Sequence, residues 1–254
     1  MPPEATATAP EEVVFDSGGL ALKGYFYLPP GEGPVPCVVN NHGSQLRPGG
    51  ADVSRPQAAA LMMSWGYAFF FPHRRGYGDS PGEPLADAVP APLGSPEHDE
   101  QLVQRLAEEC ADVLAAVAYA RSRPEIDGAR IALTGSSRGG ILSLLAAARD
   151  KDIRCAVNFS GGARQWDGHP KLKAMMLAAA HALQAPVFLA QAENDLNPKA
   201  TTELAAALER AGKTVESRIY PRWGSTAREA HRFEINGALV WGPDVRAFLG
   251  RYLD

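Results

Sequence analysis

The chain has 254 residues, a length that suits one large α/β domain or two small ones. Its 21% of charged residues, net charge of −4 and lack of a long basic run exclude a typical nucleic-acid-binding protein. No apolar run approaches the roughly 20 residues of a membrane span. The N-terminus has neither the positive start nor the apolar centre of a signal peptide. We therefore expect a cytoplasmic protein without a membrane or nucleic-acid partner.

Residues that could bind a metal or a cofactor form no known motif. Cys37, Cys110 and Cys155 are far apart and odd in number, so we expect buried apolar thiols in a reducing compartment. There is no phosphate-binding loop, no dinucleotide fingerprint and no H-x-x-x-H pair. We therefore expect no cofactor and no metal.

Apolar runs and helical patterns alternate along the chain. Residues 1–12 are expected to form a flexible arm, and residues 13–28 a β-hairpin around Ser17-Gly18-Gly19. Further strands are expected at 35–41, 67–71, 130–133, 153–159, 186–191 and 214–220. Helices are expected at 51–65, 97–122, 141–148, 171–183, 199–211 and 242–253, and residues 83–96 are expected to form an excursion over the surface.

This element order predicts an α/β fold in one domain, residues 13–254. The sheet should be mostly parallel, with an antiparallel N-terminal hairpin and helices on both faces. The stretch between Phe159 and Pro186 is too short for a large cap domain. Because ligands bind beyond the carboxyl ends of parallel strands, polar residues that follow strands are site candidates. They are His42, His73, Ser137, Ser160 and Asp195.

A G-x-S-x-G pattern, Gly135 to Gly139, stands between a strand pattern and a helix pattern. That context is typical of a nucleophile elbow, where a tight turn exposes a serine over the start of a helix. Short Gly/Ser pentapeptides also occur in ordinary loops. We interpret Ser137 as the nucleophile and Ser136 as a residue that only shapes the turn.

A serine nucleophile needs a base, and the base needs an orienting acid. Asp195, which follows the strand at 186–191, is the preferred acid; Glu193 is the alternative, and Asp195 could instead be a helix cap. His231 is the only histidine between the last strand and the last helix, although it could be a plain surface residue. The order serine, acid, histidine is the one that the elbow fold uses.

Backbone amides should stabilise the oxyanion of the intermediate. One candidate is the amide of Arg138, directly after the nucleophile, and the other is that of Ser44 or a neighbour in its loop. Gly43 lets this loop approach closely, and a structural role is favoured for His42.

Over nearly its whole length, about residues 13–253, the chain resembles the α/β-hydrolase superfamily. It is most similar to the dienelactone hydrolase and acylaminoacyl-peptidase-like branches. The resemblance implies an acyl-enzyme mechanism with Ser137, His231 and Asp195. Dienelactone hydrolases proper use a cysteine, so Ser137 argues against that activity. The motifs that carry the resemblance are Asn41-His42-Gly43, Arg75-Gly76-Tyr77-Gly78-Asp79-Ser80, Gly135 to Gly140, Asn194-Asp195 and His231-Arg232-Phe233.

The expected activity is hydrolysis of small-molecule esters with small to medium acyl groups. Alternatives are a peptidase, a thioesterase, or a binding protein without catalysis. The side chains of Arg138 and of Arg74-Arg75 could supply positive charge for a substrate carboxylate; alternatively, Arg138 points away from the site and forms an ion pair within the body. The helix at 171–183 either covers the mouth of the site or packs on the body. The candidate substrate-binding residues are Gln45, Tyr77, Trp166 and Trp223.

Overall fold

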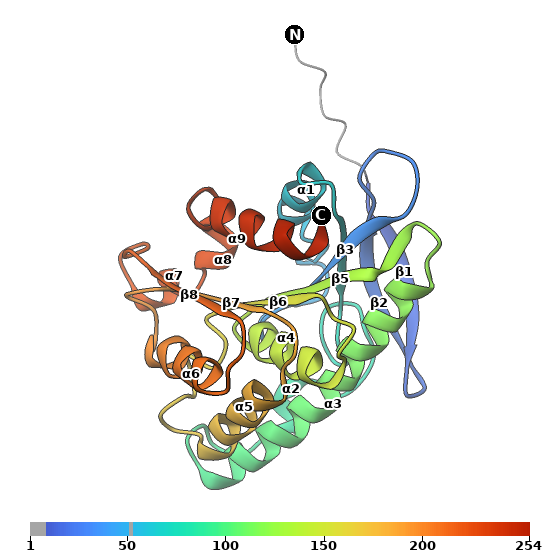
Figure 1. Cartoon of the computed structure of the whole chain (residues 1–254). Coiled ribbons are helices and arrows are strands. Elements are labelled where there is room, and N and C mark those ends of the chain that lie inside the picture. Colours follow the sequence, from blue (N-terminus) through green and yellow to red (C-terminus); the bar gives the residue numbers. More distant parts are fainter. Residues whose placement is uncertain (1–8, 51–52) are drawn as a thin grey trace.

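The computed structural model describes residues 9–50 and 53–254. One sheet of eight strands, in the order β1-β2-β4-β3-β5-β6-β7-β8, runs through the molecule (Figure 1). The β1–β2 and β2–β4 pairs are antiparallel, and the remaining pairs are parallel. The strands are β1 (Glu11–Ser17), β2 (Leu20–Tyr27), β3 (Val35–Asn41), β4 (Ala68–Pro72), β5 (Ile126–Ser136), β6 (Cys155–Phe159), β7 (Val187–Ala192) and β8 (Val215–Tyr220).

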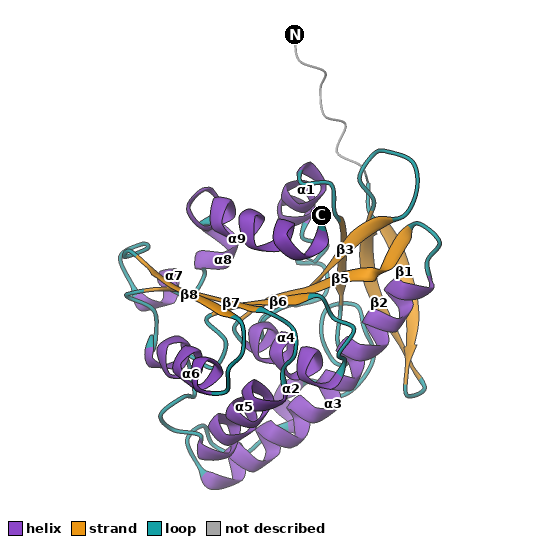
Figure 2. Ribbon diagram, viewed as in Figure 1, coloured by secondary structure: helices purple, strands orange, loops and turns teal. Residues whose placement is uncertain are grey.

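Helices cover both faces of the sheet, which gives three layers (Figure 2). Helices α1, α8 and α9 lie on one face, and α3, α4, α5 and α6 lie on the other. This is the expected α/β-hydrolase architecture, and the prediction of fold class is confirmed. The helices are α1 (Pro56–Ser64), α2 (Leu85–Ala88), α3 (Pro96–Ser122), α4 (Arg138–Arg149), α5 (Pro170–Ala182), α6 (Lys199–Arg210), α7 (Ala227–Ala230), α8 (Phe233–Asn236) and α9 (Ala238–Leu253).

The boundaries of some elements differ from those expected. The flexible arm predicted at 1–12 lies largely outside the described residues, and β1 already begins at Glu11. Helix α1 begins at Pro56, not at residue 51, because Arg55 has a left-handed backbone (φ 54°) that stops a helix. Residues 51–52 lie outside the described part. The C-terminal helix begins at Ala238, four residues before the expected start, and Pro243 lies inside it.

The central strands are buried on both faces, so they are nearly continuous apolar runs. Where polar side chains occur they alternate between the faces. Asn40 donates to the Thr134 hydroxyl (2.8 Å), and its neighbour Asn41 donates to the Ser143 hydroxyl of α4 (3.0 Å). The side chain of Asn40 therefore lies on the side of α1 and α9, and that of Asn41 on the side of α4.

The predicted burial of the three cysteines is confirmed, and all are free thiols. None of the helices that the structure describes is long and apolar enough to cross a bilayer. Among the same residues, no group of three or more His, Cys, Asp and Glu side chains is arranged to hold a metal ion.

Helix α4 starts in very close contact with β3. A Cβ atom added to Gly139 would lie 1.8 Å from the carbonyl oxygen of Asn41. No side chain fits between atoms at that distance, so only glycine lets the helix start against the strand. This contact determines where β5 can turn into α4.

We expect Gly139→Ala to lower the free energy of unfolding by about 3 kcal/mol or more, because the added methyl group must push α4 away from β3. Urea unfolding followed by circular dichroism measures the loss. The matched control is Gly168→Ala, where an added Cβ meets no atom within 4 Å. Equal stabilities of the two variants would contradict the argument.

Candidate active site

Ser137 lies at the turn between β5 and α4 in a strained conformation, with φ 56° and ψ −120°. Such a backbone costs a non-glycine residue about 1–3 kcal/mol, and the surrounding contacts must enforce it. The amide of Ser137 donates to the carbonyl oxygen of Phe159 on β6 (2.8 Å), which holds the turn from the other side. The hydroxyl is thereby placed over the N-terminus of α4.

His231 lies between Ser137 and Asp195. Its Nε2 is 2.9 Å from Oγ of Ser137, and its Nδ1 is 2.8 Å from Oδ1 of Asp195. With the proton on Nδ1 donated to the carboxylate, Nε2 is free to accept the serine proton. The structure thus brings together the three residues that the sequence nominated for this chemistry.

The long stretch between β8 and His231 is folded rather than loose. Thr226 and Glu229 form a capping box that starts α7, and His231 caps the C-terminal end of that short helix. The carboxylate of Glu229 also accepts from the Ser225 amide. Helix α8 follows, and Phe233 packs against Trp223 with ring centroids 5.5 Å apart. These contacts fix the direction from which the imidazole reaches Ser137.

Asp195 is 6% exposed, and hydrogen bonds surround its carboxylate. Gln191 donates to Oδ2 (3.0 Å), and the Leu196 amide donates to Oδ1 (2.5 Å). Burial acts to raise the pKa of Asp195, but the hydrogen bonds from His231, Ser160 and the Leu196 amide outweigh it and leave the pKa below its usual value. The carboxylate therefore stays charged. Glu193, the alternative acid, is exposed.

Sequence reasoning gave no role to the two polar residues that support Asp195. Gln191 is the penultimate residue of β7, and its side-chain oxygen Oε1 accepts from the Thr201 hydroxyl (2.6 Å). Ser160 follows β6 with φ 56°, and its hydroxyl bonds to Asp195. The sequence does carry an indication for Gln191, because it is the one polar residue in an otherwise apolar strand.

The loop after β3 lies against Ser137. A Cβ atom at Gly43 would be 3.7 Å from Cβ of Ser137, so the backbone of this loop approaches the serine directly. Ser44 and Gln45 are exposed at the mouth. The Arg138 amide lies in the first turn of α4. Like the other amides of a first helical turn, it has no acceptor within the helix. The oxyanion roles of the Ser44 and Arg138 amides remain predictions.

His42 is buried beneath the loop that carries Gly43. Its Nδ1 donates to the carbonyl oxygen of Gly43 (2.7 Å), and its Nε2 accepts from the amide of Arg74 (3.2 Å). Burial, and then the charge of Arg74, holds the pKa of His42 well below its ordinary value. The imidazole is therefore neutral and fixes the loop, as favoured from the sequence.

The side chain of Arg138 faces the body and not the site. Its guanidinium makes a bidentate pair with Glu109 of α3 (2.8 and 3.0 Å). Arg74 and Arg105 also donate to Glu109 (3.0 Å each), and Arg75 pairs with Asp112. Of the two interpretations of these arginines, the one with a substrate carboxylate is wrong. Each of these guanidinium groups pairs with a buried carboxylate on α3.

Two of the predicted substrate-binding residues are buried. Trp166 is 1% exposed, lies in the core and donates from Nε1 to Glu203. Tyr77 is 4% exposed and packs edge-on against His42. Trp166 is packed in the core and its Nε1 is paired, so it offers no face to a ligand. The Tyr77 hydroxyl is buried without a hydrogen-bond partner in the described part of the chain, and its role remains a prediction. For Gln45 and Trp223 the role remains a prediction. Helix α5 buries Leu172, Met176, Ala179 and Ala180, so it packs on the body.

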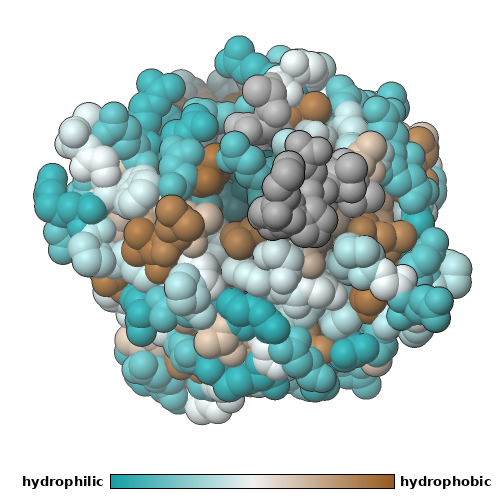
Figure 3. Space-filling view, turned by 90° about the horizontal axis from the view of Figure 1, so that it is seen from above, coloured by the Kyte–Doolittle hydropathy of each residue, from teal (hydrophilic) through white to brown (hydrophobic). Residues whose placement is uncertain are grey.

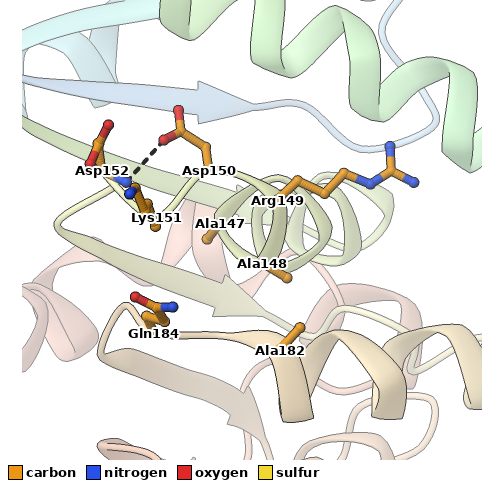
Figure 4. A pocket seen from close by; sticks show the side chains of 8 residues that line it. All are labelled: Ala147, Ala148, Arg149, Asp150, Lys151, Asp152, Ala182 and Gln184. Carbon is orange, nitrogen blue, oxygen red and sulfur yellow. Dashed lines mark hydrogen bonds between the residues drawn. The ribbon is translucent and has the colours of Figure 1, made fainter.

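Two hollows in the described part of the chain differ in their relation to the site. The first lies at the C-terminal end of α4, about 16 Å along the helix from Ser137 (Figure 4). Four charged residues, three alanines and Gln184 line it. The Asp152 amide donates to the Asp150 carboxylate, and none of the proposed catalytic residues borders this hollow. The second is a cavity of about 460 Å³ between α1, α8 and α9, at the carboxyl ends of β3, β5 and β6.

Residues 18–232 match a family model described as X-Pro dipeptidyl-peptidase (S15 family). The chain belongs to this family. The match spans both the elbow and His231, and the expected membership of the α/β-hydrolase superfamily is thereby confirmed. Among curated proteins, the quorum-quenching protein AidA of Acinetobacter baumannii is 32% identical over 151 residues. That alignment covers 59% of this chain and 43% of AidA, so the chain spans less than half of that relative.

Solved structures share the fold of this S15-family chain at low sequence identity. The acylaminoacyl peptidase of Pyrococcus horikoshii superposes with a TM-score of 0.71 at 20% identity, covering 96% of this chain and 42% of that one. The acetyl xylan esterase of Paenibacillus sp. R4 superposes with a TM-score of 0.69 at 20% identity. The superposition covers 100% of this chain and 87% of the esterase. The esterase Pf2001 of Pyrococcus furiosus superposes with a TM-score of 0.70 at 17% identity. The superposition covers 96% of this chain and 91% of the esterase.

We expect Glu109→Ala to cost about 3–5 kcal/mol of stability, because it leaves three buried guanidinium groups without their shared carboxylate. Chemical unfolding measures this loss. The control is the neighbouring Glu108→Ala, whose side chain is 42% exposed and which should cost less than about 1 kcal/mol. A loss at Glu109 no larger than that at Glu108 would show that the cluster is not a stabilising centre.

Two buried histidines should make the stability depend on pH. His42 and His73 both have pKa values lowered by burial, so they stay neutral in the folded chain. The unfolded chain takes up protons on both below about pH 6.5, so stability falls as pH falls below that value. The slope should reach about 1.4 kcal/mol per pH unit for each histidine. Asp195 adds a separate loss at more acid pH, where its folded carboxylate is protonated.

The measurement is the free energy of unfolding in urea between pH 7.5 and 5.5. His42→Gln should reduce the slope, whereas the change of the exposed His181 to Gln should leave it as in the wild type. A stability that is flat over this range contradicts the assignment of neutral buried histidines.

Proposed function

We propose that the protein is a serine hydrolase that cleaves carboxylic esters of small to medium acyl groups through an acyl-enzyme intermediate. The observation that carries the proposal is the continuous chain of contacts from Oγ of Ser137 through His231 to Asp195, with links of 2.9 and 2.8 Å. Hydrogen-bonded contacts of this length are what proton transfer from serine to imidazole requires.

In the proposed mechanism, Oγ of Ser137 attacks the ester carbonyl carbon while Nε2 of His231 takes its proton. The carboxylate of Asp195 stabilises the imidazolium. The oxyanion is bound by the amide of Arg138 and by an amide of the Gly43–Ser44 loop. When the intermediate collapses, the alcohol leaves with the proton from His231 and the acyl group stays on Ser137. Water, deprotonated by His231, then attacks the acyl-enzyme and releases the acid.

An ester substrate is favoured over a peptide by the charges at the larger cavity. A dipeptidyl-peptidase must bind the ammonium group of a peptide N-terminus. The carboxylate that borders the cavity belongs to Glu234, and Arg55 already neutralises it at 2.5 Å. Solved esterases that share this fold also support an ester substrate.

Peptidase activity is the second candidate, and the family match supports it. Thioester cleavage could use the same three residues. A binding protein without catalysis is disfavoured, because such a protein has no need of a strained serine in contact with an imidazole. Chromogenic esters, aminoacyl anilides and acyl thioesters separate the three hydrolytic activities.

We expect Ser137→Ala to lower kcat for p-nitrophenyl acetate by about 10⁴-fold or more with the fold intact, because the nucleophile is lost. The control is Ser136→Ala, which should retain activity within about 3-fold, since we assign this residue no chemistry. A fluorophosphonate probe should label the wild type and Ser136→Ala at Ser137. Undiminished turnover in Ser137→Ala, or no adduct in folded wild type, would overturn the proposal.

A further inference from the structure

The larger cavity lies next to the segments that build the active site. Phe159 lines it and accepts the Ser137 amide through its carbonyl. Asn40 and Thr134, which also line it, each lie within three residues of the oxyanion loop or the elbow. Glu234 follows His231 by three residues. The cavity therefore adjoins the segments that carry Ser137 and His231.

The cavity walls are mainly apolar. Its volume of about 460 Å³ falls in the range of pockets for small organic ligands. Seen from above, the face over α1 and α9 is hollowed (Figure 3). The apolar lining residues come from α1, α8, α9 and β6, and include Ala58, Leu61, Met62, Phe159, Ile235, Ala238, Trp241 and Val245.

Polar groups with unused hydrogen-bonding capacity also border this cavity. Asn40 is 4% exposed and Glu234 is 6% exposed. Oδ1 of Asn40, Oε2 of Glu234 and Nε of Arg55 are buried without a hydrogen-bond partner among residues 9–50 and 53–254. A buried polar atom without a partner costs about 1–3 kcal/mol, so this arrangement is stabilised by an occupant that bonds to it.

We propose, building on the proposed function, that this cavity receives the acyl group of the substrate: a medium-length apolar chain that carries one neutral group able to donate and accept hydrogen bonds, such as an amide or a hydroxyl. The apolar walls hold the chain. The neutral group donates to Asn40 or Glu234 and accepts from Arg55.

The ion pair of Arg55 and Glu234 explains why the group is neutral. The guanidinium and the carboxylate are 2.5 Å apart, and their charges cancel. A carboxylate on the acyl chain would meet Glu234, and an ammonium group would meet Arg55, each in a buried environment where repulsion is weakly screened. An amide or hydroxyl meets both residues without repulsion.

The first experiment varies the acyl chain of p-nitrophenyl esters. It compares acetyl, nonanoyl and 6-acetamidohexanoyl esters, the last two of equal chain length. Wild type should show kcat/KM about 5-fold higher for the acetamido ester than for the nonanoyl ester, the effect of about one net hydrogen bond. Matched esters that end in a carboxylate or an ammonium group should be at least about 10-fold poorer than the acetamido ester.

The second experiment fills the cavity. In Ala58→Phe, or in Ala238→Phe from the opposite wall, the ratio of nonanoyl to acetyl kcat/KM should fall by about 10-fold or more, because the ring occupies the space of the chain. The matched control is Ala60→Phe on the exposed side of α1, which should leave this ratio unchanged. An unchanged ratio in both cavity variants overturns the inference.

The third experiment changes the charge balance. Glu234→Gln leaves Arg55 unpaired, so the carboxylate-ended ester should gain about 10-fold over the acetamido ester, and the ammonium-ended ester should not gain. Equal response of both charged esters overturns the assignment of this ion pair. If acetyl ester is hydrolysed but no chain preference appears, the cavity inference fails and the proposed function stands. If no ester is hydrolysed by wild type, both fail.

Discussion

The close contact between Gly139 and Asn41 is the constraint on which the site depends. With 1.8 Å between a hypothetical Cβ and the carbonyl oxygen, α4 can start only where a glycine meets β3. Because β5 pairs with β3 in register up to Gly135, the chain has almost no length in which to turn from strand to helix. The positive φ of Ser137 is the geometric result. The strain at this residue is thus imposed by the packing of Gly139, two residues further along the chain.

The same region concentrates buried charge. Glu109 binds the arginines of the elbow, of the loop after β4 and of its own helix, so one carboxylate connects α3 to both loops that border the serine. Arg74 in turn donates to the carbonyl oxygen of His42 (2.9 Å). Burial acts to raise the pKa of Glu109, but the charges of Arg138 and Arg74 outweigh it and leave the pKa below its usual value. The cluster therefore remains ionised and rigid.

The succession of strands along the chain and the choice of Ser137 and Asp195 could be inferred from the sequence, because each strand is an apolar run and these two polar residues lie just beyond such runs. His231 could be chosen because it is the only histidine between the last strand and the last helix. The direction of the Arg138 side chain could not be inferred, since its partner lies 29 residues earlier in the chain. Still, Glu109 stands three residues after Leu106 on the apolar face of its helix, and a buried carboxylate there requires a cation.

The cavity had no sequence signal, because it is a space between three helices. Trp166 was misassigned because an aromatic residue in a loop beyond a strand looks the same whether the loop folds inward or outward.

His231 is held between α7 and α8, which have four residues each. Helices of that length have no stability of their own in water, so the imidazole depends on a capping box and on the packing of Phe233. Ser137 and Asp195 belong instead to the ends of buried strands. The three residues of the proposed triad thus lie on parts of the chain with unequal local support: two beside buried strands, and one between two short helices. Opening of this segment would separate the imidazole from Ser137 and Asp195 while the sheet stays folded, and it would expose the buried ring of Phe233.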